Sequence, residues 1–96
     1  MTKYEIMFIV KPTLSEEETA TVAKNFENTI NNNGSKLLEV TDMGQKELAY
    51  EIKKFKSGHY FLMTLESSDD KAIKEFDRLA LISQDVIRHL ITKLED

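Results

Sequence analysis

The apolar residues of this chain recur with two different spacings, and the order in which these spacings alternate limits the folds available to it. Recurrence at every second residue is typical of strands, and recurrence at every third or fourth residue is typical of helices. Strand-like spacing occurs at 3–11, 36–52, 59–66 and 86–94, and helix-like spacing follows Ser15 and Ser67. The predicted order of elements is therefore β-α-β-β-α-β.

Each predicted helix lies between two strands along the chain, and such crossovers place both helices on the same face of one sheet. The pattern predicts an α+β fold of the ferredoxin-like βαββαβ class, with a four-stranded antiparallel sheet in the order 4-1-3-2. A chain of 96 residues has material for one hydrophobic core, so we expect a single domain over residues 1–96. This fold class occurs in enzymes, metabolite sensors and RNA-binding proteins, so it does not select a function.

The helices have recognisable boundary signals. Ser15 and Glu18 form a capping box, in which each side chain can bond the backbone amide of the other residue. Gly34 follows three asparagines and suits the left-handed conformation that ends many helices. Asp69 and Asp70 are expected in the first turn of the second helix, where acids favour the positive end of the helix dipole.

Two interruptions are expected within the extended stretches. Gly44 lies inside the segment 36–52 and predicts a bulge or bend there. Residues 53–58 are polar except for one phenylalanine and predict a loop, after which the third strand begins at His59.

Composition excludes several classes of site. The chain contains no cysteine, so disulfides, thiolate zinc sites, iron–sulfur clusters and cysteine nucleophiles are excluded. Its longest apolar run, residues 6–10, is too short to cross a bilayer or to serve as the core of a signal peptide. We therefore expect a cytoplasmic protein without a membrane partner.

The net charge of −4 argues by itself against a nucleic-acid partner. However, the charges are unevenly distributed along the chain. Residues 15–33 carry four glutamates and one lysine, whereas residues 46–59 carry four lysines and two glutamates. Residues 86–94 add Arg88 and Lys93 without any acid. A protein that is acidic in total can therefore still present a basic face.

The strands are apolar on both faces, although two helices can cover only one face of a sheet. Isolated apolar residues on a surface are normal, whereas a contiguous patch usually marks a partner surface. Both interpretations remain open from the pattern alone. The residues that would form such a patch on the uncovered face are Met7, Ile9, Tyr60, Leu62 and Leu90.

No constellation of residues predicts catalysis. His59 follows Gly58 at a strand start and has no obvious carboxylate partner in the pattern. His89 lies among apolar strand residues, so a packed or surface side chain is a better interpretation of it than a catalyst. The three glycines are ten and fourteen positions apart and form no phosphate-binding loop. No His or acid spacing is typical of a metal site. We expect no enzymatic activity, no cofactor and no small-molecule substrate.

The segment Gly44–Lys53 reads Gly-Gln-Lys-Glu-Leu-Ala-Tyr-Glu-Ile-Lys and is the most specific motif of the chain. It resembles the signature of the bacterial small-subunit ribosomal protein S-six family, with a glycine, a basic residue two positions on, and Leu-Ala-Tyr before an isoleucine. The resemblance continues through residues 3–6, 54–61 and 86–91, and it covers essentially the whole chain.

The resemblance implies a ferredoxin-like, non-enzymatic component of the 30S ribosomal subunit without a cofactor. It also implies binding to the central domain of 16S ribosomal RNA together with ribosomal protein S-eighteen, which aids assembly of the platform. S-eighteen would occupy either the apolar sheet face or the edge of the second strand. The alternative is a ferredoxin-like regulatory or oligomerising module without RNA binding, followed by a small acyl- or phosphoryl-transfer enzyme.

The candidate RNA contacts are basic, and Arg88 comes first because it lies at the position of the family's arginine and its planar guanidinium suits phosphate. Lys46 and Lys53 lie at basic positions of the signature. Tyr50 is expected to pack rather than to stack on bases. Charge clustering alone adds Lys54, Lys56, Lys3 and Lys93.

Overall fold

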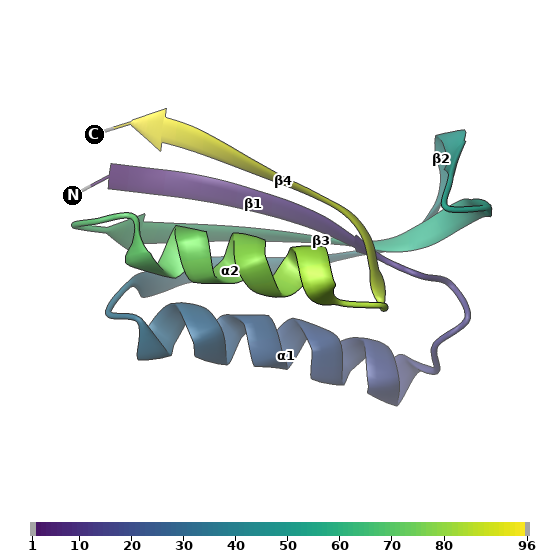
Figure 1. Ribbon diagram of the computed structural model, residues 1–96, viewed down its shortest axis with the longest axis horizontal. Helices are drawn as coiled ribbons and strands as arrows, with labels where there is room; N and C mark the ends of the chain where they lie inside the picture. Colours follow the sequence, from purple (N-terminus) through teal and green to yellow (C-terminus); the bar gives the residue numbers. More distant parts are fainter. Residues whose placement is uncertain (1, 96) are drawn as a thin grey trace.

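The structure is a computed structural model that describes residues 2–95. Its elements are β1 (Thr2–Val10), α1 (Glu16–Asn32), β2 (Lys36–Ile52), β3 (Phe55–Ser67), α2 (Lys71–Ile82) and β4 (Val86–Glu95). The strands form one antiparallel sheet in the order β2-β3-β1-β4, and both helices cover the same face of it (Figure 1). The predicted ferredoxin-like fold and strand order, read from the other edge, are confirmed.

The hydrophobic core lies between this covered face and the two helices. Phe8 at its centre is fully buried, and its ring centroid lies 5.2 Å from Phe26 of α1, 5.1 Å from Phe61 of β3 and 5.9 Å from Phe76 of α2. Burying such a side chain contributes roughly 1.5–3 kcal/mol. Because strand side chains alternate and Phe8 points toward the helices, the even-numbered residues of β1 point to the same side. The odd-numbered residues point to the opposite face of the sheet, called the outer face below.

The boundaries of α1 are as predicted. The Glu18 amide donates to Ser15 Oγ over 3.1 Å, and the Ser15 amide donates to Glu18 Oε1 over 3.2 Å, which completes the capping box. Gly34 adopts a φ of +81° directly after the C-cap residue Asn33. The left-handed ending of the helix is therefore confirmed.

The start of α2 differs from the prediction. Asp69 and Asp70 precede the helix, and its first turn contains no acid. The Ser67 hydroxyl donates to the Asp69 carbonyl over 2.6 Å and so turns the chain before the helix begins. The Asp69 carboxylate then accepts from the Lys71 amide over 3.1 Å, so Asp69 supports the helix start from outside.

The long strand β2 bends at Gly44, as predicted. Gly44 has a φ of +78°, and the register with β3 shifts between Asp42 and Gly44. The predicted loop over 53–58 is wrong beyond Lys54, because β3 already begins at Phe55. Lys53 and Lys54 have φ values of +50° and +70°, so these two residues close the hairpin in the manner of a type I′ turn.

Candidate nucleic-acid and partner interface

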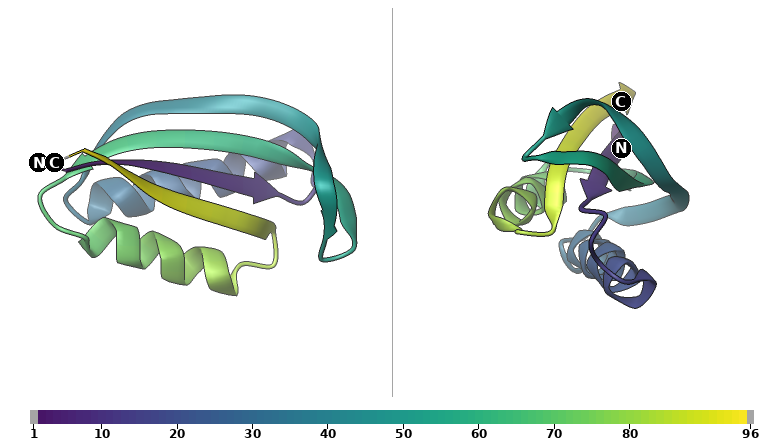
Figure 2. Two further views of the ribbon diagram at one scale, coloured as in Figure 1. Left: turned by 90° about the horizontal axis from the view of Figure 1, so that it is seen from above. Right: turned by 90° about the vertical axis from the view of Figure 1, so that its right-hand side faces the viewer.

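The hairpin formed by the end of β2 and the start of β3 bends away from the helices and lies over the outer face (Figures 1 and 2). Beneath it is a hollow of about 180 Å³, called the outer hollow below. Its lining comes from three strands of the sheet and from the hairpin. The lining residues are Met7, Ile9, Leu48, Ala49, Tyr50, Ile52, Tyr60, Arg88 and Leu90.

Strand register brings the predicted apolar patch together. Met7 lies between Leu62 of β3 and Leu90 of β4, and Ile9 lies between Tyr60 and Arg88. Residues directly opposite each other in antiparallel strands point to the same face. The five predicted patch residues therefore share the outer face, and all of them except Leu62 line the outer hollow.

Ile9 is not exposed, contrary to the prediction. It is only 3% exposed and packs directly on Gly58, where an added Cβ atom would lie 2.3 Å from Ile9 Cγ2. The same Cβ would lie 3.4 Å from Ile87 Cδ1. Ile87 is the extra residue of a bulge in β4 and is also buried. This second, small cluster was not predicted, and the available signal was Gly58 itself, since a glycine beside or within a strand often marks the close approach of another segment.

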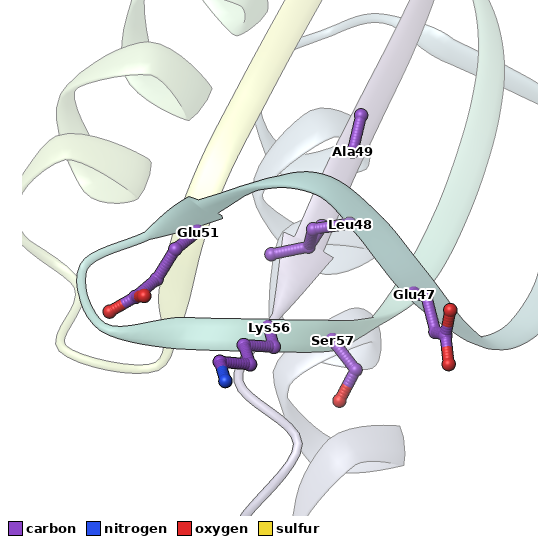
Figure 3. Close-up of a pocket in the computed structure, with 6 residues that line it drawn as sticks. All are labelled: Glu47, Leu48, Ala49, Glu51, Lys56 and Ser57. Atoms are coloured by element: carbon purple, nitrogen blue, oxygen red, sulfur yellow. The ribbon is translucent and has the colours of Figure 1, made fainter.

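A four-residue arch gives the hairpin its shape. The register between the strands runs to Glu47 opposite Ser57 and resumes only at Ile52 opposite Phe55. Residues 48–51 therefore bow away from β3, and a space of about 500 Å³ separates the two, with Lys56 at its edge (Figure 3). Tyr50 lies in this arch and is 81% exposed, so the prediction that it packs is wrong.

Five of the predicted basic residues belong to the hairpin or line the outer hollow beneath it. Arg88 is exposed and lines the outer hollow. The Lys46 ammonium lies 5.8 Å from the centroid of the Tyr60 ring, which directs it toward the same face. The other members belong to the hairpin turn and its flank. The hairpin basic cluster consists of Arg88, Lys46, Lys53, Lys54 and Lys56.

Lys3 and Lys93 do not belong to this cluster. Lys3 lies six positions before Ile9, the partner of Arg88, which corresponds to about 20 Å along the strand. Lys93 lies opposite Tyr4 and therefore on the helix-covered side of the strand alternation, whereas Lys3 shares the alternation of Ile9. Both lysines are therefore separated from Arg88, and they lie on opposite faces of the sheet.

Both histidines pair with a carboxylate. His59 Nε2 lies 2.5 Å from Asp42 Oδ1, so the prediction that His59 lacks such a partner is wrong. Burial raises the pKa of Asp42, but hydrogen bonds with the Gly44 amide and His59 outweigh it and leave the pKa below its ordinary value. His89 Nε2 lies 2.7 Å from Asp77 Oδ1 and its ring packs edge-on against Phe76, which ties β4 to α2.

These pairs do not form a metal centre. Within residues 2–95, no three His, Cys, Asp or Glu side chains come together in a way that could hold a metal ion. None of the helices in the same range has the length and apolar character needed to cross a membrane.

Comparison with known proteins identifies the family. The model of the family described as "Ribosomal protein S6" matches residues 3–93. The crystal structure of 30S ribosomal protein S6 from Thermotoga maritima superposes with a TM-score of 0.93 at 28% sequence identity, over 97% of this chain and 87% of that one. The solution structure of a hypothetical Arabidopsis thaliana protein gives a TM-score of only 0.47 at 18% identity, over 99% of this chain and 87% of that one. Since the family model spans nearly the entire sequence, this chain belongs to the ribosomal protein S6 family.

Proposed function

We propose that this protein is a non-enzymatic, structural component of the 30S ribosomal subunit that binds the central domain of 16S ribosomal RNA together with ribosomal protein S-eighteen. The observation that carries the proposal is the junction of the hairpin basic cluster with the apolar outer hollow on one face. Family membership and the Thermotoga maritima structure support it. The proposed location is therefore the ribosome in the cytoplasm.

The basic cluster supplies the RNA side of this interface. Phosphate groups attract lysine and arginine with little regard for base sequence, and a guanidinium can donate two parallel hydrogen bonds to one phosphate. Arg88 is the principal contact because it lies at the rim of the hollow with its side chain exposed. Lys46 and the three hairpin lysines extend the positive surface from there. Lys3, about 20 Å along the strand, and Lys93, on the helix-covered side, would each contact RNA outside this surface.

The outer hollow supplies the protein side. Met7, Tyr60 and Leu62 are partly exposed and Leu90 is 50% exposed, so apolar surface remains uncovered beside the hairpin. The exposed Tyr50 ring from the arch lines the same hollow. Aromatic and large aliphatic side chains of this kind dominate binding energy at protein interfaces. We therefore place S-eighteen on the outer face in preference to the edge of β2.

The geometry connects the two partners through Arg88. This residue lies opposite Ile9 on β4 and lines the apolar outer hollow, so one side chain can border S-eighteen through its aliphatic part and offer its guanidinium to phosphate. Binding of S-eighteen beside it would restrict the arginine before RNA arrives, which lowers the entropy lost on binding phosphate. S-eighteen would also contribute positive charge that a protein of net charge −4 lacks.

The experiment is RNA binding at two salt concentrations, using a central-domain fragment of 16S ribosomal RNA with and without S-eighteen. We expect binding only with both proteins and a steep loss of affinity at higher salt. Absence of RNA binding together with homodimers in solution would support the regulatory or oligomerising alternative. Arg78→Ala is the control for Arg88→Ala, since Arg78 is the chain's other arginine and lies on α2 beside Glu75.

A further inference from the structure

A second groove lies on the helix-covered side of the molecule, between α1 and β2. It has a volume of about 460 Å³ and is called the side groove below. Residues of α1 form one wall, and β2 and β3 form the other wall and the floor. The lining consists of Glu16, Thr19, Ala20, Ala23 and Glu27 from α1, Val40 and Asp42 from β2, and His59 and Phe61 from β3.

We propose that the side groove binds an extended, lysine- or arginine-bearing segment of a partner protein, which adds as a further strand to the open edge of β2. This inference does not depend on the RNA-binding function proposed above, because it uses other residues and another side of the sheet. It rests on the shape of the groove, on the unpaired strand edge and on the charge of the walls.

The groove has room at the sheet because the facing residues of α1 are small. Ala20, Ala23 and Thr19 line the helix wall between Glu16 and Glu27, so the α1 residues of the lining include no large apolar side chain that would fill the space beside β2. The floor is apolar, with Phe61 buried and Val40 partly buried. A strand that enters here can place alternate apolar side chains on this floor.

The edge of β2 offers backbone groups to such a strand. Within residues 2–95, β2 pairs only with β3, although β2 runs over 17 residues. Natural proteins usually keep edge strands short or cover them, because unpaired backbone groups along an edge pair readily with another chain. A long open edge beside a groove therefore favours addition of a strand.

The walls select a basic segment. Glu16, Glu27 and Asp42 line the groove, and none of its lining residues is a lysine or arginine. The pKa of Asp42 is lowered, so this carboxylate is charged at neutral pH, and its partner His59 lies on the same wall. These carboxylates repel phosphate groups and thus exclude RNA as the occupant, whereas they attract ammonium and guanidinium groups.

The test uses a fluorescein-labelled octapeptide of four Lys-Val repeats and the intact protein. We expect saturable binding by fluorescence anisotropy, no binding of the matching Glu-Val peptide, and loss of binding when alternate amides of the Lys-Val peptide are N-methylated. Glu27→Lys should weaken binding about tenfold. Glu17→Lys makes the same charge change on the same helix but outside the groove, so it should change affinity much less.

Chemical shifts of backbone amides identify where the peptide binds. We expect the largest changes in β2 near Val40, with none at Arg88 or Leu90. Equal weakening by Glu17→Lys and Glu27→Lys, or undiminished binding of the N-methylated peptide, would reduce the effect to general charge attraction and overturn the proposal. Shifts confined to the outer hollow would overturn it as well. None of these outcomes bears on RNA binding through Arg88, so the two proposals fail separately.

Discussion

Ile9 of β1 packs against the bare backbone of Gly58 in β3, where a methyl group at position 58 would lie 2.3 Å from Ile9 Cγ2 and 3.2 Å from the Val10 carbonyl oxygen. This contact lies where the hairpin leaves the plane of the sheet. It joins β1 to the base of the hairpin, which carries the four lysines of the hairpin basic cluster.

Gly58→Ala should therefore reduce the free energy of unfolding by about 1–3 kcal/mol, the range for overpacking a well-filled site. Urea denaturation measures the effect. The double variant Ile9→Ala/Gly58→Ala should be less destabilised than the sum of the two single variants, because the clash with Ile9 is removed. Strict additivity of the two changes would show that Ile9 and Gly58 are not coupled.

Arg88→Ala should weaken binding of central-domain RNA by the complex with S-eighteen and should reduce the slope of log affinity against log salt by roughly one unit. Filter binding over a series of salt concentrations measures both quantities. Arg78→Ala should leave the slope unchanged, because Arg78 lies on α2 and pairs with Glu75. An unaltered slope for Arg88→Ala would remove Arg88 from the RNA contacts.

Leu90→Glu should weaken association with S-eighteen about tenfold, since it places a charge on exposed apolar surface of the outer hollow. The fold should be retained because Leu90 is half exposed. Titration calorimetry of the two proteins gives the affinity. Leu81→Glu changes an exposed leucine at the end of α2 and is the matched control. Equal effects of the two variants would argue against the outer face as the partner surface.

Lys53→Asn/Lys54→Gly should raise the free energy of unfolding by about 1 kcal/mol, because both lysines have positive φ and Asn-Gly suits a type I′ turn. The same variant removes two charges of the hairpin basic cluster, so affinity for RNA should fall while stability rises. Thermal denaturation and RNA binding of one protein sample test both halves. A parallel fall of stability and affinity would contradict the turn assignment.

Asp42→Asn tests the hydrogen bonds that the Asp42 carboxylate forms with the Gly44 amide and with His59. The pKa of Asp42 is lowered in the folded protein, so its charged form contributes stability that is complete above its unfolded pKa of about 4 and is lost as pH falls through the lower folded value. The difference in free energy of unfolding between wild type and variant should therefore be constant from pH 5 to pH 4.5, because this range lies about half a unit or more above the unfolded pKa of Asp42. The difference should shrink below about pH 4. Urea denaturation between about pH 5 and pH 3 measures this difference. A constant difference throughout would exclude a contribution of these hydrogen bonds to stability.

The order of elements could be predicted because local spacing carries it. The alternation of Ile6, Phe8 and Val10 in β1 and the capping box at Ser15 depend only on neighbours in sequence. The turn between the second and third strands was also placed correctly at Lys53, although its predicted length was too great. For the same reason, the shared face of Met7, Tyr60 and Leu90 follows from alternation and strand order together.

The features of the candidate site that escaped prediction depend on how the strands pair. Ile9 alternates with core residues and would be exposed in a flat sheet, but the bent hairpin buries it. His59 gains Asp42 only because β2 and β3 pair across the bulge at Gly44. Tyr50 is exposed because four residues of β2 lie opposite one residue of β3. The strand propensities of single residues do not predict such a difference in length between paired strands.

The side groove is lined by three carboxylates and by no lysine or arginine, whereas Arg88 and Lys46 lie at the opposite, outer face of the sheet. A polyanion is therefore repelled locally at one of these places and attracted locally at the other. Collisions that begin at the outer face are the productive ones, and added salt slows association by shortening the range of the attraction there.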